Sequence, residues 1–87
     1  MEQQQLLAEN LQQRELTPGE RAVGLTFNPG GNAMVDTIKR KYAEIIDLLE
    51  GFRQTSPTPG AARHASIAIT DAETAQMRAV KAVTFPY

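Results

Sequence analysis

Two stretches of the chain carry hydrophobic side chains at helical spacing. The first covers residues 33–54. Its apolar positions recur at alternating steps of three and four, the pattern of one face of an amphipathic helix. They are Val35, Ile38, Tyr42, Ile45, Leu49 and Phe52. Asn32 stands directly before the stretch, where an amide side chain commonly caps a helix. Asp36 and Arg40 have the spacing of a favourable surface ion pair. The pattern predicts a helix over 33–54.

The second stretch carries alanines at alternating steps of four and three. They are Ala61, Ala65, Ala68, Ala72, Ala75, Ala79 and Ala82. Thr58 is the expected cap, and Pro59 suits the first helical position. Small side chains let helix axes approach closely, and a short connection makes the two helices antiparallel neighbours. We therefore expect an αα-hairpin over 33–84. Two helices cannot enclose every apolar side chain, so we assign the remaining edges to subunit contacts. These edges are Ile67, Ile69 and Met77.

The N-terminal third of the chain is less strongly patterned. Residues 3–15 consist of good helix formers with few apolar positions, which predicts a short, mostly solvated helix. The next segment has two interpretations: a turn, or a helix start in which Thr17 and Glu20 form a capping box. Gly19 favours the turn. Residues 21–33 contain the breaker sequence Asn-Pro-Gly-Gly and are predicted to form a loop.

These elements predict one all-α domain that assembles into a compact homo-oligomer. Its expected parts are an N-terminal helix and turn (1–20), a loop (21–33), the helical hairpin (33–84) and a tail (85–87). A chain of 87 residues without cysteine buries little apolar surface by itself, and oligomerisation is a usual remedy.

Composition excludes several classes of protein. The chain has no cysteine and a single histidine, which excludes disulfide scaffolds, cysteine or multi-histidine metal sites and thiol nucleophiles. The formal net charge is −1, whereas a domain that coats duplex nucleic acid is expected to be basic. No stretch is apolar enough to cross a membrane, and the first residues lack the profile of a signal peptide. We therefore expect a cytosolic protein without DNA or membrane partners.

Few residues suggest catalysis. His64 and Asp71 are seven residues apart and share a helical face, but no nucleophile or orienting group accompanies them, so an ordinary surface histidine fits better. No nucleotide-binding or metal-binding motif is present. Gly30 and Gly31 precede a helix, where backbone N–H groups could bind a phosphate or simply form a turn. We predict no catalytic residue, cofactor or metal site.

The loop offers a more specific possibility. Phe27 and Asn28 lie in an uncharged stretch that follows Arg21. An aromatic ring, an amide and a guanidinium are together suited to recognising a small nucleotide. The alternative is that Phe27 only plugs the end of the hairpin, and the residues alone leave both interpretations open. The other cations fit a solvated helix surface.

Residues 21–84 resemble the phage anti-CBASS sponge family, which acts against the bacterial cyclic-oligonucleotide signalling system CBASS. Four segments carry the resemblance. They are Arg21-Ala-Val-Gly-Leu-Thr-Phe-Asn-Pro-Gly-Gly-Asn, Val35-Asp-Thr-Ile-Lys, Ile45-Ile-Asp-Leu-Leu-Glu and Ala65-Ser-Ile-Ala-Ile-Thr-Asp-Ala-Glu-Thr-Ala-Gln-Met-Arg-Ala-Val-Lys-Ala-Val-Thr. The helical hairpin is also similar to that of a phage anti-Thoeris sponge that captures a cyclic ADP-ribose isomer.

The resemblance implies a nucleotide-binding protein rather than an enzyme. Members of the family form homo-oligomers, typically hexamers, and bind cyclic dinucleotides and cyclic trinucleotides between subunits without cleaving them. The expected location is the cytoplasm of the infected bacterial host. The implied ligand contacts are Arg21, Thr26, Phe27, Asn28 and Arg63. Of these, Arg63 suits a phosphate because a guanidinium binds phosphate through two hydrogen bonds.

Two other functions stay open beside this one. The helical pattern alone also fits a structural assembly protein that binds no ligand. A phosphodiesterase that destroys the messenger is disfavoured because the sequence offers no metal site or catalytic group. A DNA-binding regulator is less favoured than either of these two, because the net charge is −1.

Overall fold

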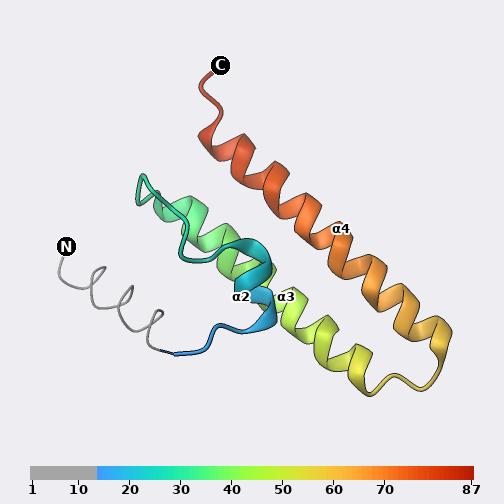
Figure 1. Cartoon of the computed structure of the whole chain (residues 1–87). Coiled ribbons are helices and arrows are strands. Elements are labelled where there is room, and N and C mark those ends of the chain that lie inside the picture. Colours follow the sequence, from blue (N-terminus) through green and yellow to red (C-terminus); the bar gives the residue numbers. More distant parts are fainter. Residues whose placement is uncertain (1–13) are drawn as a thin grey trace.

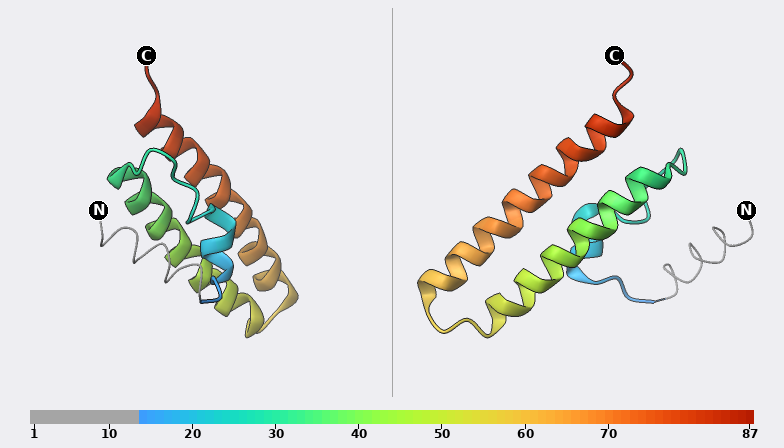
Figure 2. Two further views of the ribbon diagram at one scale, coloured as in Figure 1. Left: turned by 60° about the vertical axis from the view of Figure 1, so that its left-hand side comes forward. Right: turned by 180° about the vertical axis from the view of Figure 1, so that it is seen from behind.

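The computed structural model describes residues 14–87, and every regular element in this part of the chain is an α-helix. Helix α2 spans Pro18–Val23, α3 spans Ala33–Gln54 and α4 spans Pro59–Thr84. Helices α3 and α4 run antiparallel side by side, and α2 crosses one face of the pair (Figures 1 and 2). The predicted helical hairpin is thus confirmed. The helix expected over residues 3–15 lies almost entirely outside the described residues.

Both long helices begin at the predicted caps. The side-chain oxygen of Asn32 accepts hydrogen bonds from the N–H groups of Met34 (2.9 Å) and Val35 (3.1 Å). Thr58 accepts from the N–H of Ala61 at 3.1 Å, and a proline occupies the first turn of α4. These bonds satisfy N–H groups that have no partner within the helix. The two N-termini, and with them the hairpin connection, therefore follow from local sequence.

The segment around Gly19 is a helix start, so the turn that this glycine favoured is wrong. Thr17 caps α2 by accepting from the N–H of Glu20 (3.1 Å), and the Glu20 carboxylate accepts from the N–H of Thr17 (2.9 Å). This is the capping box. The absence of a side chain at Gly19 lets α2 pack closely on α3, because a Cβ at this position would lie 2.2 Å from the carbonyl oxygen of Ala43. The predicted 21–33 loop is shortened accordingly, since residues 21–23 are helical and the loop covers 24–32.

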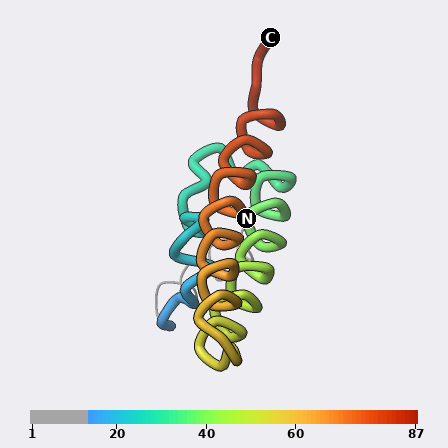
Figure 3. The backbone as a smooth tube through the Cα atoms, turned by 90° about the vertical axis from the view of Figure 1, so that its right-hand side faces the viewer, coloured from blue at the N-terminus to red at the C-terminus, as the bar shows by residue number. Residues whose placement is uncertain are grey.

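The core lies where α2 and the turn after it cover the hairpin. Figure 3 shows α2 and the following loop on one side of the α3–α4 pair. The buried cluster consists of Val23, Leu25, Ala43 and Ile46, with Ala22, Tyr42, Ile69 and Ala72 packed against it. The assignment of Ile69 to subunit contacts is therefore wrong, because this side chain has a partner within the chain. Ile67 and Met77 are exposed as expected.

The buried face of α3 is offset from the predicted stripe. The buried positions are Val35, Lys39, Ala43 and Ile46. Ile45 and Phe52 belong to the predicted stripe, yet each is about half exposed, at 48% and 49%. The offset arises because α2 and its following turn cover the side of α3 that carries Lys39 and Ala43. The small side chain of Ala43 allows this approach and contributes nothing to a pattern of bulky residues.

Only part of the alanine stripe of α4 packs against α3. Ala65 is buried, whereas Ala75 and Ala82 are exposed. Gln76 is also buried, at 4% exposure. The alanines therefore line the packed face near the hairpin connection and leave it toward the C-terminus.

Candidate functional site

The 24–32 loop leaves α2 through a defined helix-ending motif. Gly24 adopts the left-handed conformation (φ 61°) that favours glycine. Its N–H donates to the carbonyl of Arg21 (3.2 Å), and the N–H of Leu25 donates to the carbonyl of Glu20 (3.0 Å). This pair of bonds is the Schellman motif. Because Leu25 is buried in the core, the start of the loop is fixed on the hairpin.

A buried lysine of α3 holds the next residues. The Lys39 ammonium donates to the carbonyl of Gly24 at 3.0 Å and to the carbonyl of Phe27. It also lies over the Phe27 ring, 5.6 Å from the ring centroid. Lys39 is only 6% exposed, and this burial lowers its pKa, while the nearby Asp36 carboxylate acts in the opposite direction. The lysine thereby connects both ends of the Gly24–Phe27 turn to α3.

The rest of the loop is closed by its own amide groups. The N–H of Gly31 donates to the carbonyl of Asn28 at 3.0 Å, which forms a tight turn. The Asn28 side chain donates to the carbonyl of Asn32 (2.9 Å) and accepts from its N–H (3.3 Å). Both ends of this amide are therefore engaged inside the loop. Thr26 and Phe27 remain outward, with the phenylalanine 72% exposed. The hydrophobic-plug interpretation does not fit such exposure.

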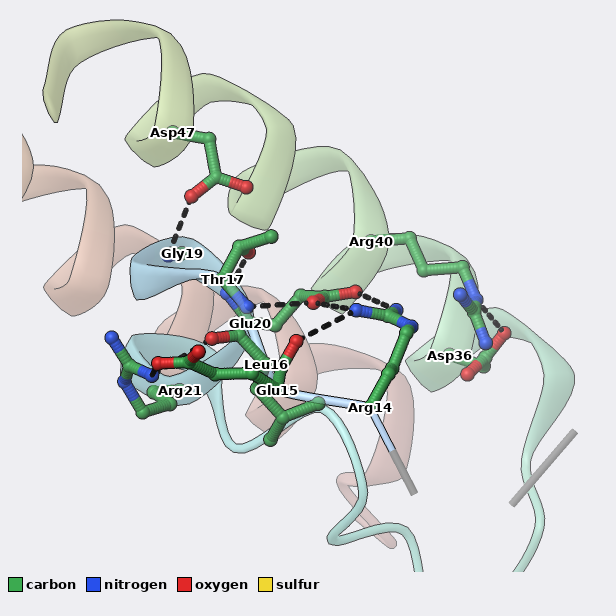
Figure 4. A network of polar contacts seen from close by, with 10 residues as sticks. All are labelled: Arg14, Glu15, Leu16, Thr17, Gly19, Glu20, Arg21, Asp36, Arg40 and Asp47. Carbon is green, nitrogen blue, oxygen red and sulfur yellow. Dashed lines mark hydrogen bonds and ion pairs between the residues drawn. The ribbon is translucent and has the colours of Figure 1, made fainter. Parts of the chain in front are cut away.

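Arg21 is engaged on the outer side of α2. Its guanidinium donates to the carbonyl of Leu16 (2.8 Å) and lies 3.8 Å from the Glu15 carboxylate (Figure 4). The adjacent ion pair joins Arg14 and Glu20 at 2.6 Å. This hydrogen bond is the largest cause that lowers the pKa of Glu20 to about 2. The two arginines thus hold the segment before α2 in place.

Arg63 lies far from the loop within one chain. It is exposed on the first turns of α4, three residues before Ser66. Ser66 accepts from Arg53 of α3 at 3.2 Å, while the loop is bound at Lys39. Because a helix rises about 1.5 Å per residue, Arg53 and Lys39 are about 21 Å apart along α3. The structure therefore does not bring Arg63 together with Thr26 and Phe27 in one copy.

All nine cationic residues lie in the described part of the chain, and most already have partners. Three arginines form the close ion pairs with Glu20, Asp36 and Glu50. Lys81 lies over the Phe85 ring. Within residues 14–87 three cations have no carboxylate at ion-pair distance, no hydrogen bond from the charged group and no aromatic ring beneath it. These are Lys41, Arg63 and Arg78. The positive charge available to an anionic ligand is therefore small and local.

Two surface hollows formed by residues 14–87 contain none of the predicted site residues. An open groove of about 590 Å³ runs along the end of α3, lined by Asp47, Leu48, Leu49, Gly51, Phe52 and Thr55. A smaller hollow of about 120 Å³ lies beside α2. The described residues contain no cluster of three or more potential metal ligands. None of the helices between residues 14 and 87 is long and apolar enough to span a bilayer.

The family model of the Acb2/Tad1 hairpin domain matches residues 19–84. The chain belongs to this family. Acb2/Tad1 proteins are the anti-CBASS and anti-Thoeris sponges of phages, and as a family they bind cyclic nucleotides rather than act as enzymes. Searches of curated proteins and of solved structures gave no match.

The Acb2/Tad1 match begins at Gly19, where the backbones of α2 and α3 meet. It includes the capped loop and ends at the last residue of α4. The residue that sequence reasoning missed in this region is Lys39, which the charge pattern placed among the solvated cations. The sequence did contain a signal for the burial of Lys39, because this residue lies four positions after Val35 and four before Ala43. It therefore shares a helix face with apolar positions.

Proposed function

We propose that this protein captures cyclic di- and trinucleotides without cleaving them, and so blocks CBASS-type immunity in the cytoplasm of the infected host. The match of the family model over residues 19–84 carries this proposal. Side chains that the fold leaves exposed support the proposal. Thr26 and Phe27 are presented outward from a tightly bonded loop, and Arg63 is an exposed cation with no ion-pair partner within residues 14–87.

The proposed sites combine residues from different copies of the chain. Arg63 and the 24–32 loop lie at different levels of the hairpin, so one ring of two or three nucleotides would contact both only if two copies supplied them. A symmetric assembly repeats each contact around its axis, which suits a ligand with two or three equivalent phosphates. We infer a homo-oligomer, with a hexamer as the expected size. The exposed apolar side chains of α3 supply area for such contacts, among them Ile45, Leu48 and Phe52.

In these sites Arg63 binds a phosphate through its guanidinium. The Thr26 hydroxyl donates to a phosphate or a base edge, and the Phe27 ring stacks on a base. Arg21 and Asn28 remain proposed contacts as well, although their side chains already bond to backbone groups of their own segment. Ligand binding through them would use the remaining donors and acceptors.

The experiment mixes the purified protein with a panel of cyclic di- and trinucleotides. The filtered complex is heat-denatured, and the released nucleotide is identified by mass spectrometry. Intact cyclic nucleotide in the released fraction is the expected result. Linear product would instead indicate a phosphodiesterase. If no member of the panel is retained, the structural assembly function, which the exposed apolar face of α3 also fits, becomes the better description.

A pair of arginine variants tests the proposed phosphate contact. Arg63→Ala should weaken binding by about tenfold to a hundredfold, because a hydrogen bond to a charged group contributes about 1.5–3 kcal/mol. Arg78→Ala removes the same charge from an exposed position of the same helix and should leave the affinity within about twofold. Equal losses in the two variants would mean that net charge, and not Arg63, determines affinity. Light scattering of both variants shows whether the assembly has stayed intact.

A further inference from the structure

Lys39 is the one charged side chain that is buried within residues 14–87. A buried ammonium is unfavourable unless hydrogen bonds replace its water. Here those bonds go to two carbonyls of a single turn, those of Gly24 and Phe27. An apolar side chain of similar length could fill the same space on α3 without this cost. The presence of a lysine therefore points to a role in shaping the turn rather than in packing the hairpin.

The bonds of Lys39 determine how the turn is presented. The carbonyl of Gly24 accepts from the N–H of Phe27 at 2.9 Å and also from the ammonium. Thr26 lies between the two carbonyls that the lysine holds, and it is exposed. The ammonium lies over the Phe27 ring, yet Phe27 remains 72% exposed. One cation thus bonds the turn to α3 and lies over the Phe27 ring, while the Phe27 side chain stays exposed to solvent.

We propose that Lys39 is a positioning residue for the nucleotide site: its ammonium fixes the Gly24–Phe27 turn and the Phe27 ring in the arrangement that receives a cyclic nucleotide. This inference rests on the proposed function and assigns Lys39 no direct contact with the ligand. Without the lysine, the turn keeps its Schellman ending and its Phe27 N–H bond, but loses the connection between Phe27 and α3. The ring is then free to sample other orientations.

Three variants test the proposal in the full chain. Lys39→Met keeps the length of the side chain and removes the ammonium, and Lys39→Arg restores donors at the same position. Lys41→Met is the matched control, because it removes an exposed lysine two residues further along the same helix. Affinities for cyclic di-AMP and cyclic tri-AMP are measured by titration calorimetry. Thermal unfolding of each variant reports on the hairpin separately.

The expected result is a loss of affinity of about tenfold or more for Lys39→Met, since apparent affinity falls with the fraction of molecules in the binding-competent conformation. Lys41→Met should bind within about twofold of the wild type, and Lys39→Arg should recover most of the loss. Amide exchange at Phe27 should accelerate in Lys39→Met while exchange in the middle of α3 stays unchanged. Equal affinities for the two methionine variants would overturn the proposal and leave the proposed function standing.

Two further readouts do not depend on the ligand. If the wild type binds no member of the cyclic nucleotide panel, the proposed function fails, and amide exchange at Phe27 still decides whether Lys39 orders the turn. If Lys39→Met does not fold, the wild type itself is examined by NMR. Nuclear Overhauser effects between the ε-protons of Lys39 and the Phe27 ring support the arrangement, and their absence overturns it.

Discussion

Replacing Gly19 by alanine tests the contact that seats α2 on the hairpin. A Cβ at this position would lie 2.2 Å from the carbonyl oxygen of Ala43 and 2.9 Å from an Asp47 carboxylate oxygen. Since the closest favourable C···O contacts are about 3.3 Å, α2 would have to move away by about 1 Å. The Gly19 N–H donates to that same carboxylate at 2.8 Å, so the movement stretches this hydrogen bond as well.

The cost can be bounded from these contacts. Overpacking at a tight interface costs about 1–3 kcal/mol, and a hydrogen bond to a charged acceptor contributes about 1.5–3 kcal/mol. Alanine recovers about 0.5–1 kcal/mol through its better helix propensity. The terms overlap because one movement causes both losses, so we expect Gly19→Ala to be destabilised by about 2–4 kcal/mol. For a chain of this size that corresponds to a fall in Tm of about 10–20 °C.

The assay is thermal and urea unfolding followed by circular dichroism, at one protomer concentration because assembly shifts apparent stability. Gly51→Ala is the matched control. Gly51 is exposed within α3, and a Cβ added there would meet no other part of residues 14–87 within 4 Å. This control should gain about 0.5–1 kcal/mol. If Gly19→Ala matched the control, the close seating of α2 on α3 would be refuted.

Three other predictions concern local features. The pKa of Glu20 falls from its ordinary value of 4.5 to about 2 in the folded chain. The stability that this carboxylate gives the fold is therefore complete above about pH 4.5 and is lost as the pH falls toward 2. Glu20→Gln should flatten the acid unfolding curve in this window, and an unchanged curve would contradict the ion pair with Arg14. Thr58→Ala removes the cap of α4 and should cost about 1 kcal/mol in urea unfolding. Ile46→Ala, at a side chain only 1% exposed, should cost about 2–5 kcal/mol; a cost below 1 kcal/mol would contradict its central place in the core.

The hairpin could be predicted from the sequence because its signals are local. Asn32 and Thr58 cap the helices through side-chain bonds to the next residues, and such bonds need no partner from elsewhere in the chain. Helix α2 has equally local signals in its capping box. The sequence nevertheless favours a turn there, because Gly19 disfavours a helix on propensity alone. The reason for the glycine is the backbone of Ala43, which is distant in sequence and becomes visible only once the chain has folded.

The buried face of α3 could be predicted only roughly for a related reason. Periodicity counts bulky side chains, whereas α2 packs where Ala43 is small and where Lys39 bonds to the turn. The predicted stripe therefore runs through Ile45 and Phe52, which remain about half exposed. These side chains leave apolar area on the surface of the single chain. The sequence thus indicates that apolar area is left over, but it misassigns part of that area, as Ile69 shows.

The five predicted site residues differ in whether their side chains already form hydrogen bonds within the chain. Both ends of the Asn28 amide bond to the backbone of its own loop, and the Arg21 guanidinium holds a carbonyl before α2. A loss of binding on replacing either residue would therefore include a loss of local order. Thr26, Phe27 and Arg63 remain outward, so their replacement reports more directly on ligand contact. Under the proposed function, this division allows a chain of net charge −1 to hold a small anion, because most of its cations stabilise the fold and the proposed site needs only an exposed arginine and an ordered loop from two copies.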